Sequence, residues 1–173
     1  MKKKKIFLYS LVFGPTTGIL CFLFFLMLYS GDENPLSQRR PDIGINILLI
    51  FLAIWLYKSR NGGFLHFYEG FSIGFLTNII GTLFSGISIY LFVKIIDPAP
   101  FDTWISSGKA FIIDRKEELS KFLNEESFKL QLDAFDKAMP YQIILDDLLF
   151  KQFAIVAIML ISMALRRQGD AIS

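Results

Sequence analysis

The feature that most constrains this chain is a run of 24 residues without a charged side chain, from Ile6 to Tyr29. A helix rises about 1.5 Å per residue, so the run extends for roughly 36 Å as a helix and exceeds the ~30 Å hydrocarbon core of a bilayer. It is also too long for the apolar part of a cleaved secretory signal, although four lysines precede it. The run therefore predicts a membrane-spanning helix over residues 6–29.

A second span is predicted over residues 41–57. Its apolar run, from Ile43 to Tyr57, has 15 residues and is marginal by itself. Pro41 suits the first turn of a helix, and Asp42 is favoured by the positive N-terminal end of the helix dipole. With these two residues included, the segment is long enough to cross the membrane.

Two more spans follow, over residues 71–96 and 146–165. The third run has 26 residues and one charge, Lys94, close enough to the end to reach the headgroups. The fourth run ends at Arg166-Arg167, an interfacial anchor. We therefore predict an all-α membrane protein, in which residues 1–173 form a single integral membrane domain with four transmembrane helices.

Composition agrees with this class and excludes several others. Apolar residues, with glycine counted and tyrosine left out, make up about 57% of the chain, against roughly 45 to 50% in soluble domains. Cys21 is the lone cysteine, so the chain cannot form a disulfide within itself or a multi-cysteine metal site. We expect no cofactor and no metal.

The positions of the charges predict the orientation. With a cytoplasmic N-terminus, the inner flanks hold eight basic residues, while the short loop between the first two spans holds Arg39 and Arg40. Residues 97–147 would lie outside, and they carry eleven acidic and six basic residues. We expect a multi-pass protein of the bacterial inner membrane with both termini in the cytoplasm.

The long outer segment, about residues 101–139, predicts an amphipathic helical hairpin between the third and fourth spans. Apolar residues recur there at the three-to-four-residue spacing of a helix face, and Pro140 ends the pattern. The residues that we assign to the apolar faces are Trp104, Phe111, Phe128, Leu132 and Phe135. The hairpin should lie on the bilayer or cover the outer ends of the spans.

The order of these elements resembles an uncharacterised family of four-pass bacterial membrane proteins, common in the Bacteroidota and classed as a domain of unknown function. The likeness is carried by Gly63-Phe-Leu-His-Phe-Tyr-Glu-Gly70, through Gly74, to Ile96-Asp97-Pro98. It extends over nearly the whole chain. The resemblance implies an inner-membrane location and no activity.

Small residues form a stripe along the third span. Gly70, Gly74, Asn78, Thr82 and Gly86 recur at every fourth position, which places them on one helix face. Small side chains let helix backbones approach closely in lipid. We interpret the stripe as a helix-packing face, within the bundle or toward a partner helix.

Gly14 and Pro15 predict a kink in the first span, because proline removes a backbone donor and clashes with the preceding turn. Such a kink can line a cavity, but plain bundle geometry is the commoner cause.

Two sets of ionisable residues lie near the predicted ends of spans. His66 and Glu69 are three residues apart, and we interpret them as part of an interfacial aromatic belt rather than a proton relay. Asp147 and Lys151 have the spacing of a helix ion pair, and with Asp146 they lie where the fourth span should leave the outer surface. We interpret this set as helix-end charges rather than a transport or ion-binding site.

Three functions remain open on this sequence. We favour a non-catalytic accessory or scaffold subunit that contacts lipid and a membrane-protein partner or a second copy, because no charge is expected deep in the membrane. The alternatives are a small transporter or channel, which would depend on Asn78, and an enzyme acting on a lipid-linked substrate with acidic residues near the outer interface. The sequence contains no pattern for catalytic residues, and the lysine run needs no nucleic-acid partner to explain it.

Overall fold

A computed structural model of the chain describes residues 2–31, 33–116 and 124–167. The helices it contains are α1 (Lys2–Tyr29), α2 (Pro35–Gln38), α3 (Asp42–Arg60), α4 (Phe67–Ile95), α5 (Ala99–Asp114), α7 (Glu125–Asp136), α8 (Gln142–Lys151) and α9 (Ala154–Leu165). Within the described ranges, β pairing is limited to one isolated bridge between Leu65 and Arg167. The all-α prediction is confirmed.

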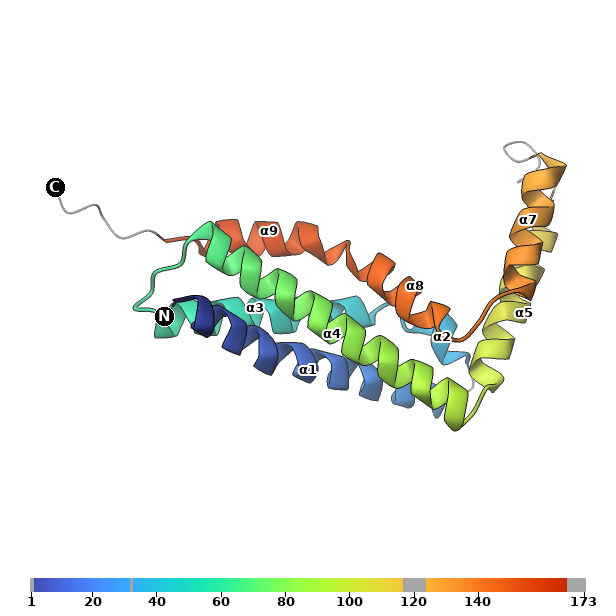
Figure 1. Cartoon of the computed structure of the whole chain (residues 1–173), viewed down its shortest axis with the longest axis horizontal. Helices are drawn as coiled ribbons and strands as arrows, with labels where there is room; N and C mark the ends of the chain where they lie inside the picture. Colours follow the sequence, from blue (N-terminus) through green and yellow to red (C-terminus); the bar gives the residue numbers. More distant parts are fainter. Residues whose placement is uncertain (1, 32, 117–123, 168–173) are drawn as a thin grey trace.

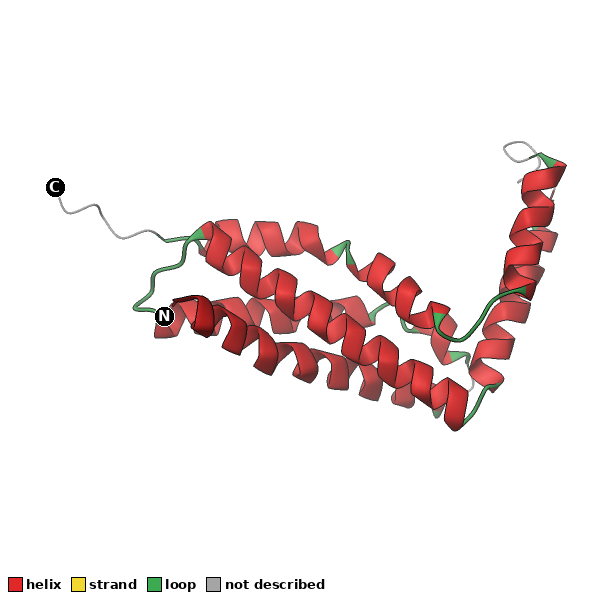
Figure 2. Ribbon diagram, in the orientation of Figure 1, coloured by secondary structure: helices red, strands yellow, loops and turns green. Residues whose placement is uncertain are grey.

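Four segments are long and apolar enough to cross a membrane, as the sequence predicts. They are Lys4–Tyr29, Asp42–Arg60, Phe67–Ile95 and Gln142–Leu165. The last of them consists of two helices, α8 and α9, with a short break between them (Figure 2). The chain is therefore a multi-pass membrane protein by the length and composition of its helices.

The third span begins four residues earlier than predicted. The Glu69 carboxylate accepts a hydrogen bond of 3.0 Å from the backbone N–H of His66, which leaves the helix to begin at Phe67. A carboxylate in the first turn is also favoured by the helix dipole. The segment interpreted as an aromatic belt is thus the first turn of α4.

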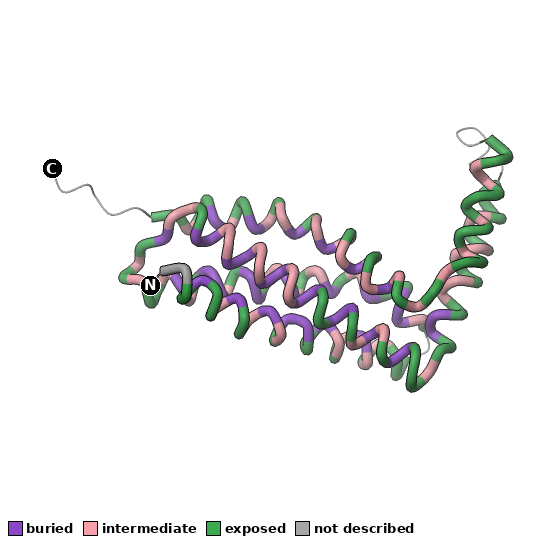
Figure 3. The backbone as a smooth tube through the Cα atoms, viewed as in Figure 1, coloured by how far each residue is buried: buried purple, intermediate pink, exposed green. Residues whose placement is uncertain are grey.

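The spans pack into a bundle whose two ends differ (Figure 1). The start of α1 and the end of α9 lie at one end, which we call the terminus end. Helices α5 and α7 lie at the other end, which we call the hairpin end, and they extend sideways from it. The burial pattern shows buried residues facing the bundle interior and exposed residues facing outward (Figure 3).

Many of the outward-facing residues are large and apolar, which is the reverse of a water-soluble surface. On α1 alone, Leu8, Val12, Leu23 and Met27 are each more than half exposed. A lipid environment would cover these side chains without cost. The interior holds an apolar cluster at each end, one around Ile50, Ile73 and Ile158 and the other around Phe25, Leu36 and Phe92.

Helices α1 and α4 pack most closely where α1 carries glycine. A Cβ atom at Gly14 would lie 2.6 Å from Ile80 Cβ, and one at Gly18 would lie 2.6 Å from Phe84 Cβ. Both distances are too short for real atoms, so only glycine allows α4 to lie at this distance. Helix α1 continues without interruption through Gly14 and Pro15, and a kink at this point stays a prediction.

Helices α5 and α7 form the two arms of the predicted hairpin in residues 101–139, of which 117–123 lie outside the described residues. Phe135 of α7 packs on Gly108 of α5, and Lys109 forms an ion pair with Asp136. Of the predicted apolar residues, Trp104, Phe128, Leu132 and Phe135 are partly buried, whereas Phe111 is 55% exposed. The hairpin therefore has a packed inner face and an apolar surface left uncovered.

The contact between α1 and α4 generates a test with an internal control. Gly18→Val should destabilise the bundle by about 1–3 kcal/mol, because the added atoms overlap Phe84. Gly44→Val is the matched control, since a Cβ at Gly44 meets no atom within 4 Å. Unfolding in detergent micelles, followed by circular dichroism, measures both. Equal stability of the two variants would contradict the close packing described for α1 and α4.

Candidate functional site

The last span is interrupted next to a buried lysine. Lys151 ends α8, and the N–H groups of Gln152 and Phe153 bond to carbonyls three residues back instead of four. The N–H of Ile155, which would bond to the Lys151 carbonyl in a regular helix, bonds to the Gln152 carbonyl at 2.9 Å. The carbonyl of Lys151 is thereby released from the helix.

Asn78 of α4 fills the bonding position that the break creates. Its Nδ2 donates to the Lys151 carbonyl oxygen at 3.2 Å, and its Oδ1 accepts from Nδ2 of Asn46, on α3, at 2.6 Å. All three residues are fully buried. A backbone carbonyl at this depth needs such a donor, because lipid supplies none. Asn78 therefore connects α3, α4 and the broken span.

The Lys151 ammonium lies between two carboxylates from different spans. Its Nζ is 2.9 Å from Asp42 Oδ2, on α3, and 3.4 Å from Asp147 Oδ2, one turn earlier in α8. Nζ also donates to Ser85 Oγ at 3.3 Å. None of these residues is more than 2% exposed. One ammonium group thus joins α3, α4 and α8 in the interior of the bundle.

Arg39 extends this set of charges toward the hairpin end. Its guanidinium donates to Asp147 Oδ1 at 2.8 Å and lies 3.5 Å from Asp146 Oδ2. Asp146 also pairs with Arg40 at 3.2 Å. The side chains of Arg40 and Asp146 are 41% and 32% exposed, and that of Arg39 is 4% exposed. The charges therefore form a series from a half-exposed entrance to a closed interior.

The short helix α2 places Arg39 inside the bundle. Asn34 caps α2 by accepting a hydrogen bond from the Leu36 N–H at 2.8 Å, and it donates to the Pro100 carbonyl at 2.7 Å. Leu36 is buried in the apolar cluster of the hairpin end. The connection between α1 and α3 is thus folded back onto the spans, and Arg39 points inward at its end.

We call Arg39, Arg40, Asp42, Asp146, Asp147 and Lys151 the charge cluster. It contains three cations and three carboxylates, so its formal net charge is zero. Neutrality matters because an unpaired buried charge costs several kcal/mol. Beside the cluster, Asn46 Oδ1 and Thr82 Oγ1 are buried and have no hydrogen-bond partner among the residues that the structure describes.

The charge cluster corrects the sequence interpretation. Asp147 and Lys151 are not exposed charges at a helix end, because both are buried in the bundle interior with Asp42 and Arg39. Burial in the bundle does not give depth in a bilayer, so the expectation that no charge lies deep in the membrane stays a prediction. A signal was present in the spacing of the last span, whose buried face runs through Ile143, Asp147, Lys151, Ala154, Ile158 and Ser162.

The predicted stripe on α4 faces the last span of the same chain. A Cβ at Gly74 would lie 2.7 Å from Ile158 Cγ2, and one at Gly86 would lie 3.2 Å from Ile144 Cα. Gly70 faces Ser162, while Asn78 and Thr82 are buried between these positions. The stripe is therefore covered within the bundle, by α8 and α9.

The remaining ionisable candidates stay apart from the charge cluster. Glu69 is buried at the terminus end, where it accepts a hydrogen bond of 3.0 Å from Tyr57 Oη. Asp97 accepts hydrogen bonds from Tyr29 Oη and from the Ala99 N–H, near the start of α5. Asp102 lies on the hairpin. Within the described ranges, no three His, Cys, Asp or Glu side chains gather as they would around a metal ion.

A comparison with protein families matches residues 12–167, which include most of the first span, the whole of the other three and the whole charge cluster. The chain belongs to the DUF4199 family. Its description is a protein of unknown function. No curated protein and no solved structure matches the chain. The function of this DUF4199 chain must therefore be argued from its own residues.

The pairing in the charge cluster predicts the outcome of charge removal. Lys151→Met should destabilise the bundle by about 3–5 kcal/mol, because it leaves the Asp42 carboxylate buried without a cation. The double variant Lys151→Met/Asp42→Asn should recover part of this loss, since it restores neutrality.

Lys94→Met is the control for removing a lysine, because Lys94 is exposed and bonds to Tyr90 alone among the described residues. It should change stability by less than about 0.5 kcal/mol. Unfolding in detergent measures all three variants. A double variant that is less stable than Lys151→Met would contradict the pairing.

Proposed function

We propose that the charge cluster binds and releases a proton, and that this DUF4199 chain is a small proton-conducting transporter or channel, or a subunit of one. The observation that carries the proposal is Lys151, buried between Asp42 and Asp147 at the point where the last span is broken. Ionisable groups inside membrane bundles are costly and commonly mark proton or ion pathways. Broken helices are a recurring element of transport sites.

The free-energy cost of burying the charge cluster supports a role beyond holding the helices together. Apolar side chains of similar volume often stabilise a protein as well as a buried ion pair does. The bundle already has two apolar clusters to stabilise it. Six ionisable groups in one place are therefore better explained by chemistry that needs a change of charge.

The charge cluster is accessible to solvent from the hairpin end of the bundle. The series begins at the half-exposed Arg40 and Asp146 and continues through Arg39 and Asp147 to Lys151. Beyond Asn78 and Asn46, the apolar cluster of Ile50, Ile73 and Ile158 fills the interior toward the terminus end. A proton would thus enter from the hairpin end and would need a conformational change to leave at the other.

The break after Lys151 supplies an element that can move. A proton bound by Asp42 would weaken its ion pair with Lys151, which links α8 to α3. Helix α8 could then shift relative to α9 at Gln152 and Phe153, where the regular hydrogen bonds are missing. The unpartnered oxygens of Asn46 and Thr82 are suited to hold water beside the site.

Proton flux in liposomes tests this function. Wild-type protein reconstituted with a pH-sensitive dye inside should dissipate an imposed pH gradient, and Asp42→Asn should reduce the rate to that of protein-free liposomes. Asp133→Asn is the control, because Asp133 is an exposed acid on the hairpin. Size-exclusion chromatography and thermal unfolding establish that each variant is folded. A folded Asp42→Asn variant with wild-type flux would refute the proposal.

We also propose that the termini lie in the cytoplasm and the hairpin outside it. The excess of basic residues at the ends of the spans near the termini supports this orientation, as does the acidic balance of residues 97–147. The proton would then enter the charge cluster from outside the cytoplasm, which is the acidic side of an energised inner membrane.

An accessory role, with a membrane-protein partner or a second copy, is favoured by a different observation. Phe111, Ile113 and Leu130 are each more than half exposed on the hairpin, away from the bundle. The α4 stripe is covered by α8 and α9, so the hairpin is the surface on which this role depends. The accessory role is compatible with transport if the chain is one subunit of a transporter.

Gentle extraction of a tagged chain from its own membrane tests the accessory role. A partner should be recovered in a fixed ratio with wild-type protein and lost with Phe111→Glu/Leu130→Glu. Ser107→Glu, at an exposed position of α5, adds charge without removing apolar surface and should retain the partner. Recovery of a pure monomer from wild-type membranes would argue against this role.

A further inference from the structure

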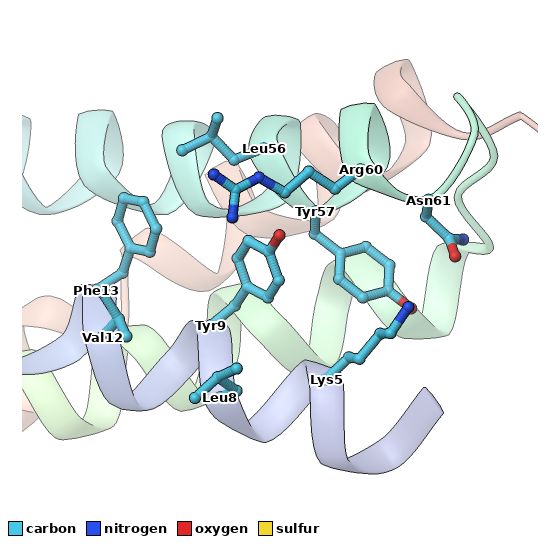
Figure 4. A pocket seen from close by; sticks show the side chains of 9 residues that line it. All are labelled: Lys5, Leu8, Tyr9, Val12, Phe13, Leu56, Tyr57, Arg60 and Asn61. Atoms are coloured by element: carbon cyan, nitrogen blue, oxygen red, sulfur yellow. The ribbon is translucent and has the colours of Figure 1, made fainter. Parts of the chain in front are cut away.

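A groove between α1 and α3 at the terminus end has no part in the proposed transport. Its volume is about 430 Å³, and Figure 4 shows its lining from close by. The lining residues are Lys5, Leu8, Tyr9, Val12, Phe13, Leu56, Tyr57, Arg60 and Asn61. This volume lies in the range of small-molecule sites.

The groove opens toward lipid rather than toward the bundle interior. Leu8 and Val12 on its α1 side are 58% and 55% exposed. Tyr57, on the α3 side, is fully buried and packs edge-on against Tyr9, with ring centroids 5.5 Å apart. The inner wall is therefore fixed, while the outer wall is formed by side chains that face the hydrocarbon.

Both cations of the groove lie at the ends of their candidate spans, where lipid headgroups are expected. Lys5 is the second residue of the span Lys4–Tyr29, and Arg60 is the last residue of the span Asp42–Arg60. The side chains of Lys5 and Arg60 extend into the groove from α1 and α3, respectively (Figure 4). In the described part of the chain, neither forms an ion pair, and none of the lining residues is acidic.

We infer that this groove binds an anionic phospholipid, with the phosphate between Lys5 and Arg60 and an acyl chain along Leu8, Val12 and Phe13. The two cations supply charge complementarity to an anion, and the apolar lining would leave a free inorganic anion unsolvated. Basic pockets between transmembrane helices are suited to acidic headgroups. A zwitterionic lipid would gain less from two cations. This inference does not depend on the charge cluster.

Lipid binding to the full-length protein tests the inference. Native mass spectrometry from detergent micelles compares phosphatidylglycerol with phosphatidylcholine of the same acyl chains. Each cation should raise the affinity for the anionic lipid about fivefold. Wild-type protein should therefore bind phosphatidylglycerol roughly 25-fold more tightly than phosphatidylcholine. Lys5→Gln/Arg60→Gln should abolish most of this preference.

The matched control is Lys58→Gln/Arg166→Gln, which removes two cations from the same end but none from the groove lining. It should keep the wild-type preference. Equal losses in the two double variants would show general surface attraction and overturn the site. An absence of preference in the wild-type protein would also overturn it.

A second variant tests the acyl-chain position and does not rely on charge removal. Val12→Trp fills the groove from an exposed position, so the fold should tolerate it. It should weaken the binding of both lipids, whereas Leu23→Trp, on α1 outside the groove, should not. Binding of phosphatidylglycerol that is unchanged in Val12→Trp would refute the assignment, as would competition by inorganic phosphate at equal concentration.

Discussion

The rest of the structure depends on one constraint, which is that a buried ammonium group must lie next to a carboxylate. Lys151 has no access to water, so α8 must approach the start of α3, where Asp42 lies 2.9 Å away. Asp42 can begin α3 in the interior only because α2 folds the preceding connection back onto the spans. The same fold brings in Arg39, which pairs with Asp147 and makes the set of charges neutral. The positions of α2, α3 and α8 thus follow from one need for charge balance.

The break in the last span lies next to Lys151 and is supported by α3 and α4. A regular helix would satisfy the Lys151 carbonyl within itself, whereas here Asn78 of α4 donates to it. The hydrogen bond from Asn46 orients Asn78, so the break is supported from two other spans. A change of charge in the charge cluster would therefore act next to the break after Lys151, where the last span lacks its regular hydrogen bonds. This coupling between a titratable group and a helix break is the physical basis of the transport proposal.

The sequence predicts the spans and the hairpin because both depend on local patterns. Run length decides that residues 6–29 and 71–96 cross the membrane, and helical spacing predicts α5 and α7. The charge cluster depends on proximity between residues more than 100 positions apart, such as Arg39 and Asp147. Near a predicted span end, each of these charges is fully explained by interfacial anchoring or by the helix dipole. Glycines on α1 and α4 likewise indicate close packing without identifying the partner, which is α4 for Gly18 and α9 for Gly74.

The two ends of the bundle differ in whether their cations are paired with carboxylates of the same chain. At the hairpin end, Arg39, Arg40 and Lys151 all pair with carboxylates of the same chain. At the terminus end, the cations Lys4, Lys5, Lys58, Arg60, Arg166 and Arg167 share one described carboxylate, Glu69, which is buried behind Tyr57. Among the described residues, the charge cluster is therefore neutral, whereas the terminus end carries an excess of cations. An excess of cations at the ends of spans favours anions from outside the chain, and acidic lipid headgroups would supply them. The excess of cations that supports the proposed orientation is thus the same feature that supports the proposed lipid site between α1 and α3.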